Sequence, residues 1–189
     1  MFHIEDKEFI RGKVPMTKQE VRHLSVAKLD LNEDSILLDV GAGSGSVGIE
    51  ASNFNQKGKV YGIEINPDGI EVIKQNLEKF NVTNYELIEG LAPQSIPDII
   101  IDRMFIGGSK GNMETILEWF LEHSKEDSKI VINTITLESL GDAMKSLEKL
   151  DFCDIDVVNI NVSKNKKIGR YNMMVAENPI YIISAKRSK

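Results

Sequence analysis

The amino-acid sequence predicts an α/β protein in which seven strands form one mostly parallel sheet. Three observations predict this class. Short apolar runs alternate with segments of helical periodicity from about residue 35 to residue 150. A glycine-rich turn joins the first strand to its helix, and two β-rich runs near the C-terminal end have no helix between them. The last two strands are therefore expected to be antiparallel.

The elements of this pattern can be placed in chain order. A helix is expected over residues 17–29, where Thr17 and Glu20 form a capping box and the threonine side chain can accept a backbone N–H. The first five strands are expected at residues 35–40, 59–65, 84–88, 102–106 and 129–134. The helices that follow these strands are expected at residues 45–53, 68–80, 111–123 and 137–150.

The C-terminal region is expected to complete the sheet. Residues 153–162 and 178–186 supply the antiparallel pair, and residues 163–177 form a long excursion between them. Loops of that length are often functional. The excursion is rich in cations, namely Lys164, Lys166, Lys167 and Arg170. No repeat or linker divides the chain, so residues 1–189 are expected to form a single domain.

Composition excludes several classes of protein. The formal net charge is −6, which disfavours extensive contact with the phosphates of DNA or RNA. Cys153 is the single cysteine, so neither an internal disulfide framework nor a cysteine zinc site can form. Histidines at positions 3, 23 and 123 have no metal-ligand spacing, and we expect no metal site. No apolar run reaches the roughly 20 residues of a membrane span, and no basic and apolar leader opens the chain, so we expect a cytoplasmic protein without membrane contact.

The clearest chemical signal is a glycine-rich turn, Asp39-Val40-Gly41-Ala42-Gly43-Ser44-Gly45, between the first strand and its helix. Such a turn lets a ligand approach the backbone. Residues 43–48 also satisfy the G-x-G-x-x-G pattern of dinucleotide sites. Asp39 disfavours a pyrophosphate there, whereas the cationic sulfonium and ammonium of S-adenosylmethionine tolerate a carboxylate. Glu64 ends the next strand and can accept hydrogen bonds from both ribose hydroxyls, although NAD sites use an acidic residue similarly.

Together these residues resemble the class I S-adenosylmethionine-dependent methyltransferases, which implies a doubly wound, Rossmann-like sheet with an antiparallel last strand. Three further segments, at residues 9–22, 105–112 and 133–138, resemble the precorrin-6B C15-methyltransferase (decarboxylating) family of cobalamin biosynthesis. That resemblance spans most of the chain. It implies methylation of carbon 15 of a tetrapyrrole corrin precursor, removal of carbon dioxide from the acetate on carbon 12, and a homotetramer.

The resemblance also implies which residues contact the cofactor. Besides Asp39, these are Thr17, Gly41, Ala42, Gly43, Ser44, Gly45, Glu64, Leu91 and Ala92. The sequence departs from many relatives at two of the matching positions. Leu91 stands where an acidic residue is common, so adenine is expected to meet a backbone N–H and an apolar face. Lys110 stands where glycine is common, and neither the motif nor the spacing gives it a role.

The expected substrate carries many carboxylates, so a net negative protein must gather cations at the binding site. Our hypothesis is that Arg11, Lys13 and Arg170 hold its acetate or propionate groups, with Lys18, Arg22, Arg103 and Lys110 as further cations nearby. The ring is expected near Gly107, Gly108, Ser109 and Thr134, beyond the carboxyl ends of the strands. Methyl transfer needs an acceptor held in line with the methyl group, and no acid–base pair is conspicuous, so no catalytic residue is assigned.

Three alternatives remain open on the sequence alone. A class I methyltransferase can act on RNA, DNA or another small molecule, because the fold does not specify the acceptor. Asn178-Pro179-Ile180-Tyr181 looks like the motif of amino-group methyltransferases, but that motif follows the fourth strand, where residues 105–108 stand here. The chain can also be a non-catalytic cofactor-binding protein or an NAD-dependent oxidoreductase. Turnover and competition between the two cofactors discriminate among these readings.

Overall fold

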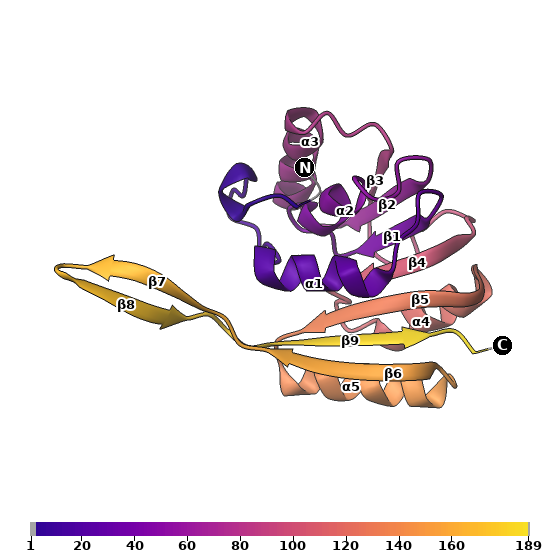
Figure 1. Cartoon of the computed structure of the whole chain (residues 1–189). Helices are drawn as coiled ribbons and strands as arrows, with labels where there is room; N and C mark the ends of the chain where they lie inside the picture. The colour runs from indigo at the N-terminus through magenta and orange to yellow at the C-terminus, as the bar shows by residue number, and fades with distance from the viewer. Residues whose placement is uncertain (1–2, 189) are drawn as a thin grey trace.

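Seven strands form the main sheet of the computed structural model, which describes residues 3–188 (Figure 1). The strand order is β3-β2-β1-β4-β5-β9-β6. The first five strands are parallel to their neighbours, and β9 runs antiparallel to both β5 and β6. The predicted class, strand number and antiparallel closure are therefore confirmed. The strand bounds are Ile36–Val40 (β1), Lys59–Glu64 (β2), Tyr85–Glu89 (β3), Ile101–Ile106 (β4), Ser124–Thr134 (β5), Cys153–Ile160 (β6) and Ile180–Lys186 (β9).

Helices cover both faces of this sheet. Side chains of β1 alternate between the faces: Leu37 packs with α1 and α2, whereas Leu38 packs with α4 and α5. Both leucines are fully buried, because each face of β1 is covered by helices. The helix bounds are Gln19–Leu29 (α1), Ser46–Ala51 (α2), Pro67–Lys79 (α3), Met113–Glu122 (α4) and Leu137–Lys149 (α5), and a 3-10 turn η1 spans Asp6–Glu8. No helix within residues 3–188 combines the length and hydropathy needed to cross a bilayer.

The start of α1 differs from its prediction. The helix begins at Gln19, its N-cap is Lys18, and no side chain caps it, so the predicted Thr17 capping box is wrong. The carbonyl of Thr17 instead accepts a hydrogen bond from Nη1 of Arg22 at 2.7 Å. Because the backbone of Lys18 is extended, Thr17 lies outside the helix.

A buried ion-pair cluster joins the N-terminal segment to α1 and α2. Arg22 is fully buried, and its Nε donates to Oε2 of the equally buried Glu50 at 2.9 Å, while its Nη1 donates to Asp6 at 3.0 Å. The Nδ1 of His3 lies 3.1 Å from Oε1 of Glu50, and His23 approaches the same carboxylate at 3.6 Å. The two histidines, whose spacing did not predict a shared partner, thus meet at Glu50. Arg22 has a structural partner and is not a free cation for substrate.

The expected excursion between β6 and β9 is an ordered hairpin. Its strands, β7 (Ser163–Ile168) and β8 (Tyr171–Ala176), pair antiparallel in a separate sheet. Figure 1 shows this arm projecting away from the main sheet. The prediction placed the segment correctly and foresaw no helix in it, but it missed both strands.

Candidate functional site

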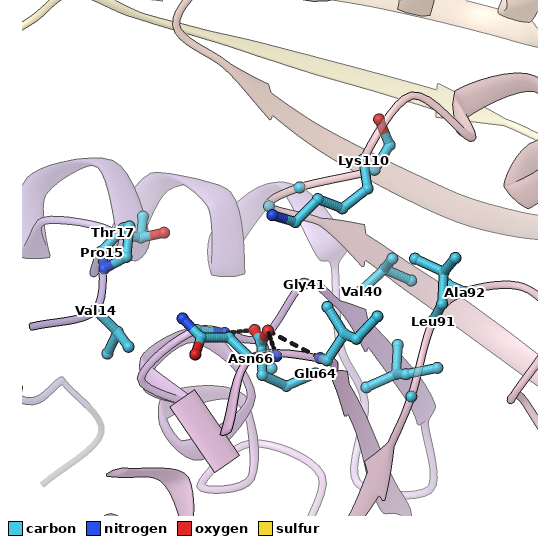
Figure 2. A pocket seen from close by; sticks show the side chains of 18 of the residues that line it. Val14, Pro15, Thr17, Val40, Gly41, Glu64, Asn66, Leu91, Ala92 and Lys110 are labelled. Carbon is cyan, nitrogen blue, oxygen red and sulfur yellow. Dashed lines mark hydrogen bonds between the residues drawn. The ribbon is translucent and has the colours of Figure 1, made fainter. Parts of the chain in front are cut away.

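A cavity of about 250 Å³ opens at the carboxyl ends of β1, β2 and β4 (Figure 2). The strand order reverses there, since β1 lies between β2 and β4 while β3 continues on the other side of β2. Ligands of open α/β sheets bind at such a reversal, because the loops that leave neighbouring strands diverge. The cavity is lined by residues 14–17, 40–43, 63–66, 90–92 and 107–110.

Two glycine-containing loops meet on one side of the cavity. Gly41, which follows β1, has a φ of 69°, and a Cβ at this position would lie 2.6 Å from the carbonyl oxygen of Gly108, after β4. Only glycine accommodates both the left-handed backbone and this approach. Gly43 and Gly45 also have positive φ values, of 58° and 75°. The predicted glycine turn therefore shapes the cavity wall through its backbone.

Glu64 is held in a fixed position at the end of β2. Its Oε2 accepts the N–H of Gly43 at 2.7 Å, and its Oε1 accepts the N–H groups of Ile65 and Asn66 at 2.9 and 2.8 Å. The residue is 8% exposed and lines the cavity. Figure 2 shows the carboxylate beside the glycine loop with these hydrogen bonds. An ionised carboxylate has about four lone-pair sites, and the three backbone N–H groups do not occupy them all. Glu64 can therefore still accept a hydrogen bond from a ligand in the cavity.

Asp39 plays a different part from the one expected. It is 1% exposed and does not line the cavity; its Oδ2 accepts the N–H of Gly48 in α2 at 3.0 Å. Burial, with a smaller contribution from the nearby Glu64 carboxylate, raises the pKa of Asp39 from 3.8 to about 7. Its other oxygen, Oδ1, has no hydrogen-bond partner among the described residues. Asp39 therefore supports the turn from beneath and does not face the cations of a cofactor.

The N-terminal segment forms another wall of the cavity and contacts the glycine turn, since a Cβ at Gly43 would lie 3.0 Å from the carbonyl oxygen of Pro15. Val14 and Met16 are buried, and they line the cavity together with Pro15 and Thr17. Two buried side chains hold this segment in place: Arg22 binds the Thr17 carbonyl, and Asn76 of α3 binds the backbone of Ile10 through both its amide oxygen and its nitrogen. The same Asn76 nitrogen donates to the carbonyl of Ser44 at 3.0 Å. One amide thus ties the segment to the glycine turn.

The loops after β3 and β4 close the remaining side. Leu91 and Ala92 line the cavity, and the Ala92 carbonyl accepts a hydrogen bond from Nδ2 of Asn112 at 3.1 Å. Gly107, Gly108, Ser109 and Lys110 line it from the β4 side.

Some predicted site residues lie away from this cavity. Arg11 and Lys13 are exposed on the turn that precedes its wall, and Arg170 is exposed at the far end of the hairpin. Ser44 and Gly45 belong to the glycine turn without lining the cavity, and buried Thr134 ends β5. Arg103, expected beside the β4 loop, donates to the carbonyls of Leu29 and Asp30 at the C-terminal end of α1.

Several residues that line the cavity were not predicted from the sequence. The residues after Glu64 are the main case: Ile65 is 45% exposed although apolar, and Asn66 caps α3 by accepting the N–H of Asp68 at 3.0 Å. The signal available in the sequence was Asn66 before Pro67, which is typical of a helix start directly after the strand that Glu64 ends. Val14, Pro15, Met16, Val40, Ile63 and Gly90 complete the set.

Comparison with known proteins identifies the family. The model of the precorrin methyltransferase domain matches residues 8–187. This chain belongs to the precorrin methyltransferase family. A probable cobalt-precorrin-6B C(15)-methyltransferase (decarboxylating) of Methanocaldococcus jannaschii is 41% identical over 187 residues, which is 98% of this chain and 99% of the relative.

Solved structures of family members agree with the fold. A precorrin-6y C5,15-methyltransferase from Geobacter metallireducens superposes with a TM-score of 0.91 at 40% identity, covering 98% of this chain and 97% of that one. A precorrin 8w decarboxylase from Methanobacterium thermoautotrophicum gives 0.89 at 33% identity, covering 97% and 100%. An O-methyltransferase from Thermotoga maritima, at 18% identity and a TM-score of 0.78, shares the fold alone, over 92% of this chain and 67% of that one. The architecture is thus that of the class I methyltransferases.

Proposed function

We propose that this protein is the cobalt-precorrin-6B C15-methyltransferase (decarboxylating) of cobalamin biosynthesis and that its methyl donor is S-adenosylmethionine. The observation that carries the proposal is a full-length match to this family combined with a cavity whose fixed carboxylate, Glu64, lies beside the glycine turn. Full-length similarity supports the acceptor chemistry, which the fold by itself does not specify.

The lining of the cavity fits an adenosyl cofactor better than a dinucleotide. Among the described residues that line it, Lys110 is the only cation and Glu64 the only anion. A pyrophosphate placed on the glycine turn would bring its charges close to the Glu64 carboxylate and to Asp39 beneath it. A ribose can instead donate both hydroxyls to Glu64, and adenine can lie against the apolar Ile65 and Leu91. The proposed cofactor contacts are Thr17, Gly41, Ala42, Gly43, Glu64, Leu91 and Ala92, with Ser44, Gly45 and Asp39 maintaining the shape of the turn.

The residues of this chain position the substrate against the cofactor and exclude water from the site of methyl transfer. When bound, the cofactor supplies an electrophilic methyl group on a sulfonium. Gly107, Gly108 and Ser109 lie beside the cavity without bulky side chains, so a flat ring can approach its open end. Holding the acceptor carbon in line with the methyl group accounts for much of the rate of such a displacement. The tetrapyrrole ring can accept the electrons released by decarboxylation, so this step requires no strong base from the protein.

The substrate's remaining carboxylates extend beyond the cavity. Arg11 and Lys13 lie on the exposed turn next to its N-terminal wall, where they can pair with acetate or propionate groups. Arg170 lies in the turn between β7 and β8, at the end of the projecting hairpin, so we propose that it pairs with a substrate held by a neighbouring copy (Figure 1). Thr134 is buried at the end of β5, so we do not include its side chain among the proposed substrate contacts.

The test is turnover under anaerobic conditions, with S-adenosylmethionine and cobalt-precorrin-6B and detection of the tetrapyrrole by mass spectrometry. We expect a product that has gained a methyl group and lost carbon dioxide. A product that has gained only the methyl group would assign decarboxylation to another protein. An unchanged tetrapyrrole in the presence of bound cofactor would contradict the proposal and favour RNA or another small molecule as the acceptor.

We also infer that the protein is a homotetramer assembled through the projecting hairpin. Every residue of β8 is exposed in the single chain. Large apolar side chains gather on the arm, and Met174 alone is 65% exposed. Contiguous apolar surface of this kind is characteristic of protein interfaces. The apolar residues are Ile168, Tyr171, Met173, Met174 and Val175. Light scattering coupled to gel filtration is expected to give four times the mass of the chain, and the mass of one chain would contradict the inference.

A further inference from the structure

Lys110 occupies a backbone position that disfavours lysine. The N–H of Asn112 donates to the carbonyl of Ser109 at 2.9 Å, which closes a tight turn with Lys110 and Gly111 in the middle. Both central residues have positive φ, 51° and 85°. These are the φ signs of a type I′ turn, in which asparagine, aspartate and glycine are preferred because side chains with a bulky Cβ strain the left-handed conformation. The conformation of the turn therefore does not explain why a lysine stands at position 110.

The position of the Lys110 side chain in the cavity offers an explanation for the lysine. Lys110 lines the cavity, and Figure 2 shows its chain extended across the opening with the ammonium group directed toward the wall that carries Pro15 and Thr17. Among the described residues, 3–188, this ammonium has no ion-pair or hydrogen-bond partner, whereas the other charged lining residue, Glu64, is bound by three backbone N–H groups. The cavity thus carries one unneutralised positive charge at its mouth.

The surroundings indicate the kind of ligand that reaches this charge. Strands β4 and β5 are parallel with Ile106 opposite Ile132, so the segments that leave them emerge side by side. On the β5 side, Ile135 and Leu137 are 62% and 71% exposed. Exposed apolar residues on the segment that neighbours the Lys110 loop suit a flat, largely apolar molecule that carries carboxylates at its edge.

We propose that Lys110 is a carboxylate-binding residue of this cavity, which holds its ligand in position through the ε-ammonium group. The inference deepens the proposed function and rests on it, because that function supplies two carboxylate-bearing ligands. One source is an acetate or propionate of the tetrapyrrole, and the other is the methionyl carboxylate of the cofactor. Lys110 takes no part in the chemical step; it is a positioning residue.

The test uses variants that retain the turn and remove the charge. Lys110→Asn and Lys110→Gly suit the left-handed backbone, Lys110→Arg keeps the charge, and Lys145→Ala removes an exposed lysine of α5 as the matched control. For the cofactor, the affinity of S-adenosylhomocysteine is compared with that of 5′-methylthioadenosine, which lacks the amino-acid carboxylate. For the substrate, the KM of cobalt-precorrin-6B is measured together with the affinity for uroporphyrin, a flat tetrapyrrole rich in carboxylates.

We expect Lys110→Asn and Lys110→Gly to weaken binding of one carboxylate ligand about 5- to 10-fold at low salt, with an unchanged or higher melting temperature and an unchanged kcat. Lys110→Arg should restore most of the affinity. Loss for S-adenosylhomocysteine but not for 5′-methylthioadenosine identifies the cofactor as the source, and loss for both tetrapyrroles identifies the substrate. Unchanged affinity for all ligands, or a lower melting temperature as the main effect, would overturn the inference.

Failure of the proposed function gives a different result. In that case the wild-type protein shows no turnover. The affinities of wild type and Lys110→Asn for uroporphyrin can still be compared, and weaker binding by the variant would still show that Lys110 binds a carboxylate. Wild-type protein that binds neither S-adenosylhomocysteine nor uroporphyrin would overturn both proposals.

Discussion

The strands around the cavity and the projecting hairpin differ in what surrounds them. Four of the five residues of β1 are buried, because helices cover both faces of the sheet, whereas all six residues of β8 are exposed. The parallel region is therefore stabilised within one chain, by apolar burial and by the Arg22–Glu50 ion pair. The hairpin has little to pack against in its own chain. Most of the apolar burial that stabilises the fold therefore lies around the site, whereas the hairpin exposes apolar surface that can bind other molecules.

The largest effect on folding is expected from the buried ion pair. Glu50→Ala leaves the Arg22 guanidinium buried without its partner, so we expect the free energy of unfolding to fall by about 3–5 kcal/mol. The matched control is Glu33→Ala, which removes an exposed partner of Lys57 and should cost less than about 1 kcal/mol. Urea denaturation at a fixed protein concentration measures both. Equal losses in the two variants would show that the Arg22 cluster has no special weight.

Two glycine-to-alanine substitutions should change the free energy of unfolding in opposite directions. Gly41→Ala places a Cβ 2.6 Å from the Gly108 carbonyl in a left-handed backbone, so we expect a loss of about 1–3 kcal/mol. Gly141→Ala lies in the exposed middle of α5 with no atom within 4 Å of the new Cβ, and it should stabilise the protein by about 0.5–1 kcal/mol. Thermal unfolding monitored by circular dichroism distinguishes the two. Stabilisation by Gly41→Ala would refute the close contact of the two loops.

The pH dependence of stability should report on Asp39. Its pKa of about 7 in the folded state lies above the ordinary 3.8, so between these values the folded protein keeps a proton that the unfolded chain has lost. The stabilisation that the protonated Asp39 gives to the folded state is therefore complete below about pH 4, and it is lost as the pH rises to about 7.

Asp39→Asn removes this dependence, because the amide stays uncharged and its oxygen can still accept the Gly48 N–H. We expect the variant to be more stable than wild type at pH 8, by on the order of 1–2 kcal/mol, and nearly equal to it at pH 4. The urea midpoints of both proteins across this range provide the measurement. The exposed Asp34→Asn serves as control, and parallel pH profiles for wild type and Asp39→Asn would contradict the assignment.

The smallest effect on folding is expected in the hairpin. Met174→Lys replaces an exposed side chain, so the free energy of unfolding of the single chain should change by less than about 0.5 kcal/mol. The same substitution places a charge in the inferred interface and should reduce the mass of the assembly in light scattering. An assembly of unchanged mass would show that β8 does not hold the subunits together.

The same contrast explains which features could be predicted from sequence. Burial on two faces gives β1 and its neighbours their apolar runs, so the sheet, the glycine turn and Glu64 could all be placed. The strand β7 contains Lys164, Lys166 and Lys167 and packs on no core, so it lacks the periodicity by which strands are recognised.

The roles of individual polar residues were harder to predict. Asp39 and Arg22 were expected to meet ligands but serve the fold, because a motif gives the position of a charge along the chain and not the direction of its side chain. The meeting of His3, His23 and Glu50 depends on contacts between residues far apart in sequence, which spacing does not reveal.

The central claim, that Glu64 binds the ribose of an adenosyl cofactor in this cavity, can be tested by a thermodynamic cycle in isothermal titration. S-adenosylhomocysteine and its analogue without the two ribose hydroxyls are each titrated into wild type and into Glu64→Gln. We predict that either change alone weakens binding about 10- to 100-fold and that the second change adds little to the first, because both remove the same hydrogen bonds. Additive losses, or equal affinity of Glu64→Gln and wild type for S-adenosylhomocysteine, would contradict the account.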